Sequence, residues 1–215
     1  MPTAIAVVDG GVVIAGTQRG SITTCPTTTA AGDAIIALID PKGRCIDAVR
    51  LASSTGTVDI DTVTARGRQV LAGGTWTGPL AVDGGGSPRD ASQGIDGFVL
   101  DVSITLAGGF GPPVFYALTG SSEDRIIDLF VDDRSIGALV STTGPATFDG
   151  SPFTVEAGTH VVILSPGGRV RRADRVVVVD GRPARLVRGS GSVMHIVGDQ
   201  GGPFRAGFVV TLGQP

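Results

Sequence analysis

Two acidic residues flank the most glycine-rich stretch of the chain. Asp83 and Asp90 enclose the run Gly84-Gly85-Gly86-Ser87-Pro88-Arg89, and Ca²⁺ needs several oxygen ligands of the kind that carboxylates supply. Their spacing does not match the ligand positions of an EF-hand loop, and aspartate beside glycine is more often a simple turn. We therefore predict no metal site and no cofactor.

Catalysis would need an acid, a base or a nucleophile. His160 and His195 lie in strand-like runs without a serine or cysteine motif beside them, and hydrolase elbows, phosphate loops and metalloprotease helices are absent from the sequence. A carboxylate pair assembled from separate loops, as glycosidases use, stays open. Its candidate members are Asp33, Asp90, Asp96 and Asp149. We predict that the protein is not an enzyme, with a polysaccharide-active hydrolase or lyase as the alternative.

The only tryptophan of the chain, Trp76, falls in a long segment between two strand-like runs. Its ring could stack on a ligand, and packing between sheets is the alternative. Charged residues in the long segments between strand-like runs could complete a binding surface. The predicted binding residues are Trp76, Asp83, Arg89, Asp90 and Asp149.

The chain has two cysteines, Cys25 and Cys45. Without a nearby histidine cluster, two cysteines do not make a zinc site. They either form one disulfide within the first repeat, which would suit an oxidising compartment, or stay as two unpaired thiols. The sequence alone leaves both alternatives open.

The composition is that of a folded and weakly acidic protein. Hydrophobic residues make up 41% of the 215 residues and charged residues 17%, a balance too apolar for disorder. The formal net charge of −3 argues against nucleic-acid binding, which needs a basic face. No apolar run approaches the roughly 20 residues of a spanning helix, so we expect no membrane insertion. Met1-Pro2-Thr3 leads directly into a strand-like run, so no signal peptide is expected here.

A short pattern recurs four times and defines the organisation of the chain. Gly16-Thr17-Gln18-Arg19-Gly20 returns as Gly74-Thr75-Trp76-Thr77-Gly78 and, more loosely, twice more. A β-rich run precedes each copy, and a second pattern follows it, as in Asp33–Ile39 and Asp96–Val102. Two sequence patterns that recur in the same order at intervals of about 60 residues indicate a repeat architecture.

Each repeat reads as short strands separated by turns. Asp9-Gly10-Gly11 and Asp40-Pro41-Lys42-Gly43 are hairpin signals, because glycine tolerates positive φ and proline presets a turn. No stretch has a long apolar face at helical spacing, so almost no helix is expected. The first repeat has predicted strands at Ala4–Val8, Val12–Ala15, Ala34–Ile39 and Cys45–Leu51. The repeats cover about 1–57, 58–123, 124–181 and 182–215, and the last ends after its third strand.

The run Gly32-Asp33-Ala34-Ile35-Ile36-Ala37-Leu38-Ile39-Asp40-Pro41-Lys42-Gly43 resembles the bacterial β-propeller repeat known as the SBBP repeat. The run Asp96-Gly97-Phe98-Val99 fits that signature better, whereas the third copy has Thr159-His160 in place of its acidic start. The resemblance covers most of the chain through short motifs. It implies a propeller and a secreted or cell-surface bacterial protein, and it transfers no functional residue.

We therefore predict one all-β domain over 1–215. It is a β-propeller-like array of four four-stranded antiparallel blades, the last lacking its outer strand. An exposed edge can pair with another chain. We expect a partial propeller or half of a larger ring, completed by a homodimer or by upstream blades of the same parent protein.

The connections between second and third strands are long in three of the repeats. They span Thr17–Asp33, Thr75–Asp96 and Ser141–Thr159. Long loops on a rigid scaffold are where binding usually lies. We predict a non-enzymatic scaffold or binding module, extracellular or at the cell surface, that presents these loops to a protein or glycan partner. A purely structural, self-assembling repeat is a further alternative.

Overall fold

The computed structural model describes residues 2–17, 25, 33–85, 89–90, 94–132, 135–149, 151, 154–176, 181–188, 194–200 and 206–212. These residues form strands, turns and loops, and none of them belongs to a helix. Within this part of the chain there is accordingly no helix of the length and hydrophobicity that a membrane span requires. The prediction of an all-β protein built from antiparallel sheets is confirmed.

The first two sheets are meanders that also take up strands from later in the chain. The first sheet has the order β1-β2-β3-β4-β7, and the second has β5-β6-β8-β9-β12-β13. The four predicted strands of the first repeat are present as β1, β2, β3 and β4, whereas β7, β12 and β13 were not predicted. Their bounds are β1 (Pro2–Val8), β2 (Gly11–Thr17), β3 (Ala34–Ile39), β4 (Cys45–Ser53), β5 (Val58–Arg66), β6 (Gln69–Trp76), β7 (Leu80–Val82), β8 (Asp96–Ser103), β9 (Val114–Gly120), β12 (Ala146–Phe148) and β13 (Thr154–Val155).

The third and fourth sheets are simple meanders. The third has the order β10-β11-β14-β15, and the fourth has β16-β17-β18. Four-stranded sheets were expected, the last without its outer strand, and the third and fourth sheets have these numbers of strands. The first two sheets are longer because they gain β7, β12 and β13 from the long connections. The remaining strands are β10 (Asp124–Val131), β11 (Ile136–Thr142), β14 (Gly158–Leu164), β15 (Val170–Val176), β16 (Gly181–Arg188), β17 (Met194–Gln200) and β18 (Ala206–Leu212).

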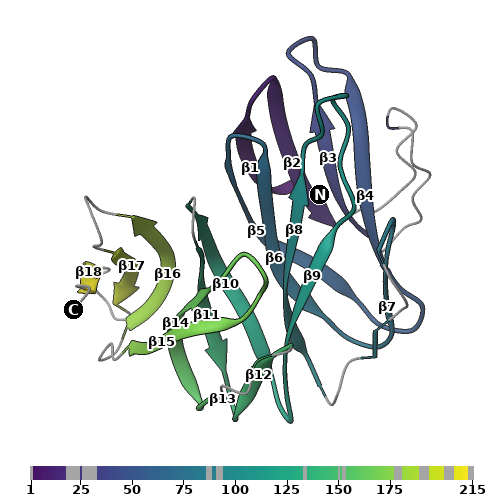
Figure 1. The fold of residues 1–215 in the computed structure, drawn as a ribbon. Helices are drawn as coiled ribbons and strands as arrows, with labels where there is room; N and C mark the ends of the chain where they lie inside the picture. The colour runs from purple at the N-terminus through teal and green to yellow at the C-terminus, as the bar shows by residue number, and fades with distance from the viewer. Residues whose placement is uncertain are drawn as a thin grey trace.

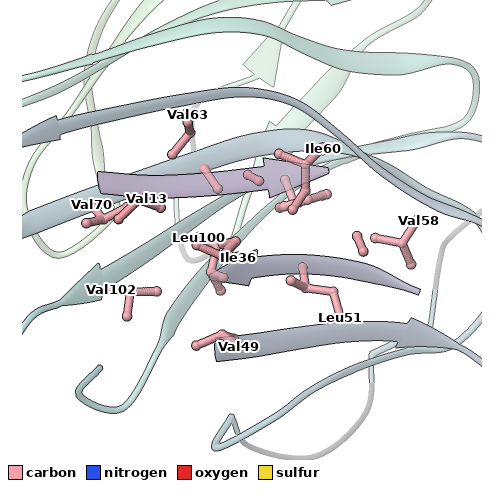
Figure 2. Packing of buried hydrophobic residues seen from close by; sticks show 14 of the residues in the cluster. Val13, Ile36, Val49, Leu51, Val58, Ile60, Val63, Val70, Leu100 and Val102 are labelled. Carbon is pink, nitrogen blue, oxygen red and sulfur yellow. The ribbon is translucent and has the colours of Figure 1, made fainter. Parts of the chain in front are cut away.

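The sheets follow one another in chain order and pack face to face (Figure 1). Inner strands such as β6 and β8 read as nearly continuous apolar runs, because neighbouring sheets cover both of their faces. Figure 2 shows one such interface, in which Ile36 of the first sheet and Leu100 of the second belong to one buried cluster. Burying a side chain of this size contributes roughly 1.5–3 kcal/mol. Sheet-on-sheet packing is therefore the main source of stability.

The first strands of the four sheets lie next to one another. β1 contacts β5, β5 contacts β10, and β10 contacts β16. In each of these strands the pairing register shifts by one residue, at Thr3, Asp61, Ile127 and Ala184. Such a shift is typical of a β-bulge, which bends the strand and redirects its side chains. The repeat seen in the sequence thus extends to an irregularity shared by all four sheets.

Candidate functional site

A cleft of about 650 Å³ lies where the four first strands meet. Its walls come from β1 and β2, from β5, from β10 and from β16, so each sheet contributes to it. The polar side chains that line it include Thr3, Asp61, Thr64, Asp128 and Arg185. A cleft of this volume is in the range that holds small-molecule ligands.

The bulges place the polar residues of this cleft. Asp61 is the bulged residue of β5, and Asp128 and Arg185 directly follow the bulges of β10 and β16. In a regular strand, successive side chains alternate between two faces that are both packed here. The extra residue breaks that alternation, so the strand can turn polar side chains toward the space between the sheets.

Asp128 ties three of the first strands together. The hydroxyl of Thr62 donates a 2.7 Å hydrogen bond to one carboxylate oxygen of Asp128, and the backbone N–H of Leu186 donates a 2.8 Å bond to the other. Arg185 lies further away, with Nη1 3.8 Å from the first of these oxygens. Thr62 and Asp128 are both buried. Asp128 therefore links three strands that line the cleft, and each of its carboxylate oxygens already accepts a hydrogen bond from the protein.

Asp61 is the carboxylate most available to a ligand. The residue is exposed in the cleft, yet nearby protein atoms crowd its carboxyl group. Partial loss of hydration raises the pKa of Asp61 above its ordinary value, Asp59 raises it further, and Arg125 opposes the change. Because the residue is exposed, we take Asp61 as a group that a ligand can reach and that accepts hydrogen bonds when ionised.

Two of the predicted binding residues on the long connections, Arg89 and Asp149, belong to a separate cluster. Arg89 makes an ion pair with Asp149, and its guanidinium lies 5.3 Å from the ring centroid of Phe115. Arg89 and Asp149 come from the connections of two different repeats, so the fold joins two of the residues named from the sequence. Phe115 was not predicted, because it lies in the regular strand β9.

Trp76 lies on the inner side of the same cluster. It is 1% exposed, and its ring packs edge-on against Phe98 and Phe115, with centroids 6.2 and 5.6 Å away. The indole therefore sits within the interface between the first and second sheets. Asp83 and Asp90 are exposed on the surface of the long connection.

The aspartates that were candidates for a catalytic carboxylate pair lie in different environments. Asp33 pairs with Arg50, with Nε 2.5 Å from the carboxylate oxygen, Asp149 pairs with Arg89, and Asp96 is fully buried. Among the residues that the structure describes, no three histidine, cysteine, aspartate or glutamate side chains are grouped so that they could hold a metal ion.

A second pair of carboxylates is buried beside the second sheet. Asp124 and Asp96 are both 0% exposed. Neither carboxylate oxygen of Asp124 has a hydrogen-bond partner. Burial raises the pKa of Asp124 to about 7, and the negative charge of Asp96 adds to the effect. Neither Asp96 nor Asp124 lines the cleft, so the pair bears on the stability of the fold and not on ligand binding there.

The two histidines do not join the cleft. His160 is 6% exposed, and burial, followed by the charge of Arg175, lowers its pKa. His195 is half-buried on β17. Neither residue lines the cleft, so neither adds an acid or a base to it.

The cysteines are joined in a disulfide. Cys25 and Cys45 are bonded across a separation of 20 residues, which is one of the two alternatives drawn from the sequence. Cys25 and Cys45 pack with Ile35, Ala37 and Ala48 on the outer part of the first sheet. The remainder of the connection between β2 and β3 lies outside the described residues.

The cleft residues were missed because each looks like an ordinary strand residue in the sequence. The available signal was the repeat itself, since aligned first strands place Asp61, Asp128 and Arg185 within one residue of the same position.

The chain matches no model of a known protein family, and no curated protein matches it.

Proposed function

We propose that the protein is a non-enzymatic binding module whose four sheets are blades of a propeller-like array, and that its ligand binds in the cleft between the first strands. The observation that carries the proposal is the convergence of four bulged strands on one polar cleft. Ligand sites occur preferentially in such concave junctions between structural units.

Three features support the propeller-like arrangement. Each repeat forms its own antiparallel meander, each first strand contacts the next first strand, and each carries its bulge at the equivalent position. Blades that radiate from a common axis bring their innermost strands together in this way. The cleft would then lie on the axis.

The chemistry of the cleft favours a small glycan. Asp61 accepts hydrogen bonds, Arg185 donates them, and the hydroxyl of Thr64 can do both. The hydroxyl of Thr3 already donates to the backbone carbonyl oxygen of Ile60, so toward a ligand it can only accept. Ile5 adds an apolar surface to the same wall. A sugar presents hydroxyls around its edge and C–H groups on its faces, so it matches this mixture better than a strongly charged ligand would.

The cleft is poorly equipped to hydrolyse that glycan. A glycosidase needs two carboxyl groups that are free to donate a proton and to attack or activate water. Both oxygens of Asp128 already accept hydrogen bonds from Thr62 and Leu186. Asp61 is then the only accessible aspartate among the residues that line the cleft in the described structure. One free carboxylate supports binding rather than hydrolysis.

The disulfide supports an extracellular or cell-surface location, because such bonds persist in oxidising compartments. A glycan ligand is consistent with that setting. The long connections remain an alternative binding surface, since they hold the exposed residues Asp83 and Asp90 as well as the Arg89–Asp149 pair.

A glycan array followed by calorimetry tests the proposal. A sugar identified on the array is titrated into the wild type, into Asp61→Asn and Arg185→Ala, and into the loop variants Asp83→Asn and Arg89→Ala. We expect both cleft variants to weaken binding at least tenfold, about 1.4 kcal/mol, and both loop variants to bind normally. An array without any bound sugar, or loss of binding only in the loop variants, would reject the cleft as the ligand site.

A further inference from the structure

Each sheet of the array has two distinct faces. We call the face toward the preceding sheet the front face and the face toward the following sheet the rear face. At the interface between the third and fourth sheets, Leu139 and Val161 of a rear face pack against Leu186 and Ile196 of a front face. The two earlier interfaces pair a rear face with a front face in the same order.

No sheet formed by the described residues covers the inner part of the front face of the first sheet, and this part is exposed. Ile5 is the second residue after the bulge of β1 and is 65% exposed, and Val7 is 79% exposed. The residues equivalent to Ile5 in the other three sheets are Val63, Leu129 and Leu186, which are 9%, 3% and 5% exposed. The outer part of this face packs against Cys25, so the open patch is confined to β1 and β2.

On β16 and β17, the described side chains of the rear face of the fourth sheet are exposed. Val197 pairs with Arg185, the residue that follows the bulge of β16, and is 37% exposed. Its equivalents Ala15 and Leu139 are 1% and 0% exposed. Val187 on the neighbouring strand is 47% exposed. The position of Val197, which is a core position in the first and third sheets, is thus left in water here.

We propose that two copies of this chain associate head to tail, with the rear face of the fourth sheet of one copy against the front face of the first sheet of the other. A second copy of the chain fits both patches, because every interface between the described sheets pairs a rear face with a front face. The described residues leave a front patch on β1 and a rear patch on β16 and β17 exposed. A twofold axis makes the two contacts identical and closes an eight-sheet ring.

Association would also complete the cleft. Ile5 and Ile14 belong to the open patch of the first sheet and line the cleft at the same time. The fourth sheet of the partner would cover that side, so the axial site is more enclosed in the dimer. The dimer itself rests on the exposed faces alone and does not depend on a ligand.

Light scattering after gel filtration, without ligand, tests this arrangement. A single chain has a mass of 21.7 kDa, and we expect the wild type to show twice that mass at micromolar concentration. Val7→Lys blocks the front patch and Val187→Lys blocks the rear patch. Both side chains are already exposed, so neither change removes a core contact of the single chain. Leu106→Lys is the matched control, since Leu106 is 90% exposed in a turn outside both patches.

The two single variants distinguish a head-to-tail dimer from a dimer in which one face packs against the same face of the other copy. Head-to-tail association predicts that Val7→Lys and Val187→Lys each yield monomers with an unchanged circular dichroism spectrum, while Leu106→Lys remains a dimer. A monomeric wild type at 100 µM would overturn the proposal. So would loss of the dimer in only one of the two patch variants, because that result requires a face packed against its own copy. Glycan binding by a monomer would leave the proposed function intact.

Discussion

Asp124 should make the protein less stable as the pH rises. Its side chain is fully buried at the start of β10, and neither oxygen has a hydrogen-bond partner. The carboxyl group also lies against the backbone of Gly120, where a Cβ would come within 2.7 Å of Oδ2. Burial raises the pKa of Asp124 from its ordinary 3.8 to about 7, with Asp96 as the second cause. The folded protein therefore favours the protonated acid.

The sign and size of the effect follow from proton linkage. Below pH 3.8, Asp124 is protonated in both the folded and the unfolded chain. Between pH 3.8 and about 7 the unfolded chain releases this proton while the folded chain keeps it, so the free energy of unfolding falls with rising pH. The loss is complete above about pH 7 and amounts to at most about 4 kcal/mol. That is a large part of the stability of an ordinary domain.

Urea unfolding of the wild type and of Asp124→Asn, at pH values from 4.5 to 8, measures the effect. We expect the difference in unfolding free energy between the two proteins to change by 2–4 kcal/mol over this range, in favour of the variant at high pH. Groups that are not coupled to Asp124, such as His160 and Asp61, titrate equally in both proteins and cancel in the difference. Asp96 is coupled to Asp124, so the difference reports on this pair of carboxyl groups. Asp83→Asn, at an exposed position, should follow the wild type. If the difference between wild type and Asp124→Asn is constant with pH, the burial argument fails.

Two further changes test the contacts between strands. Asp128→Ala removes the acceptor for the Thr62 hydroxyl and the Leu186 N–H, and we expect a loss of about 1–3 kcal/mol in unfolding free energy. Amide exchange should increase in β16 and stay unchanged in β2; equal exchange in both strands would contradict a local role for Asp128. Replacing Cys25 and Cys45 by serine opens a covalent loop of 20 residues in sequence separation and should cost about 3 kcal/mol. Urea unfolding of the double variant should match that of the reduced wild type, and a variant as stable as the oxidised protein would show that the bond contributes nothing.

The strands were predictable because their signals are local. Turn residues such as Asp9 and Gly10 end one run and begin the next, and β3 contains only apolar residues because both of its faces are covered. The meander order follows from short turns, since they pair neighbouring strands. Repeated spacing then gives the number of sheets. All of these features depend on residues close together in the chain.

The cleft was not predictable in the same way, because its shape depends on how each first strand pairs with its partner strand. Nothing in the run Ile60-Asp61-Thr62 distinguishes a bulge from regular alternation until the partner strand β6 is placed beside it. The hydrogen bond from Thr62 to Asp128 joins residues 66 positions apart, and these lie in different sheets. Trp76 was named as a possible ligand contact, and its position between Phe98 and Phe115 depends equally on distant packing.

The long connections have a structural role that their length alone did not suggest. β7 pairs with β4, the outer strand of the first sheet, and β12 pairs with β9, the outer strand of the second. An outer strand with unpaired backbone groups is prone to join another chain. In each case the connection of the following repeat reaches back and covers that edge. In the fourth repeat the equivalent connection is short, and in the described part of the chain β15 stays the last strand of its sheet. Protection of the sheet edges thus explains part of the length of these connections, which had suggested binding loops. The first strands, and not the outer edges of the sheets, are therefore the better candidate for the ligand site.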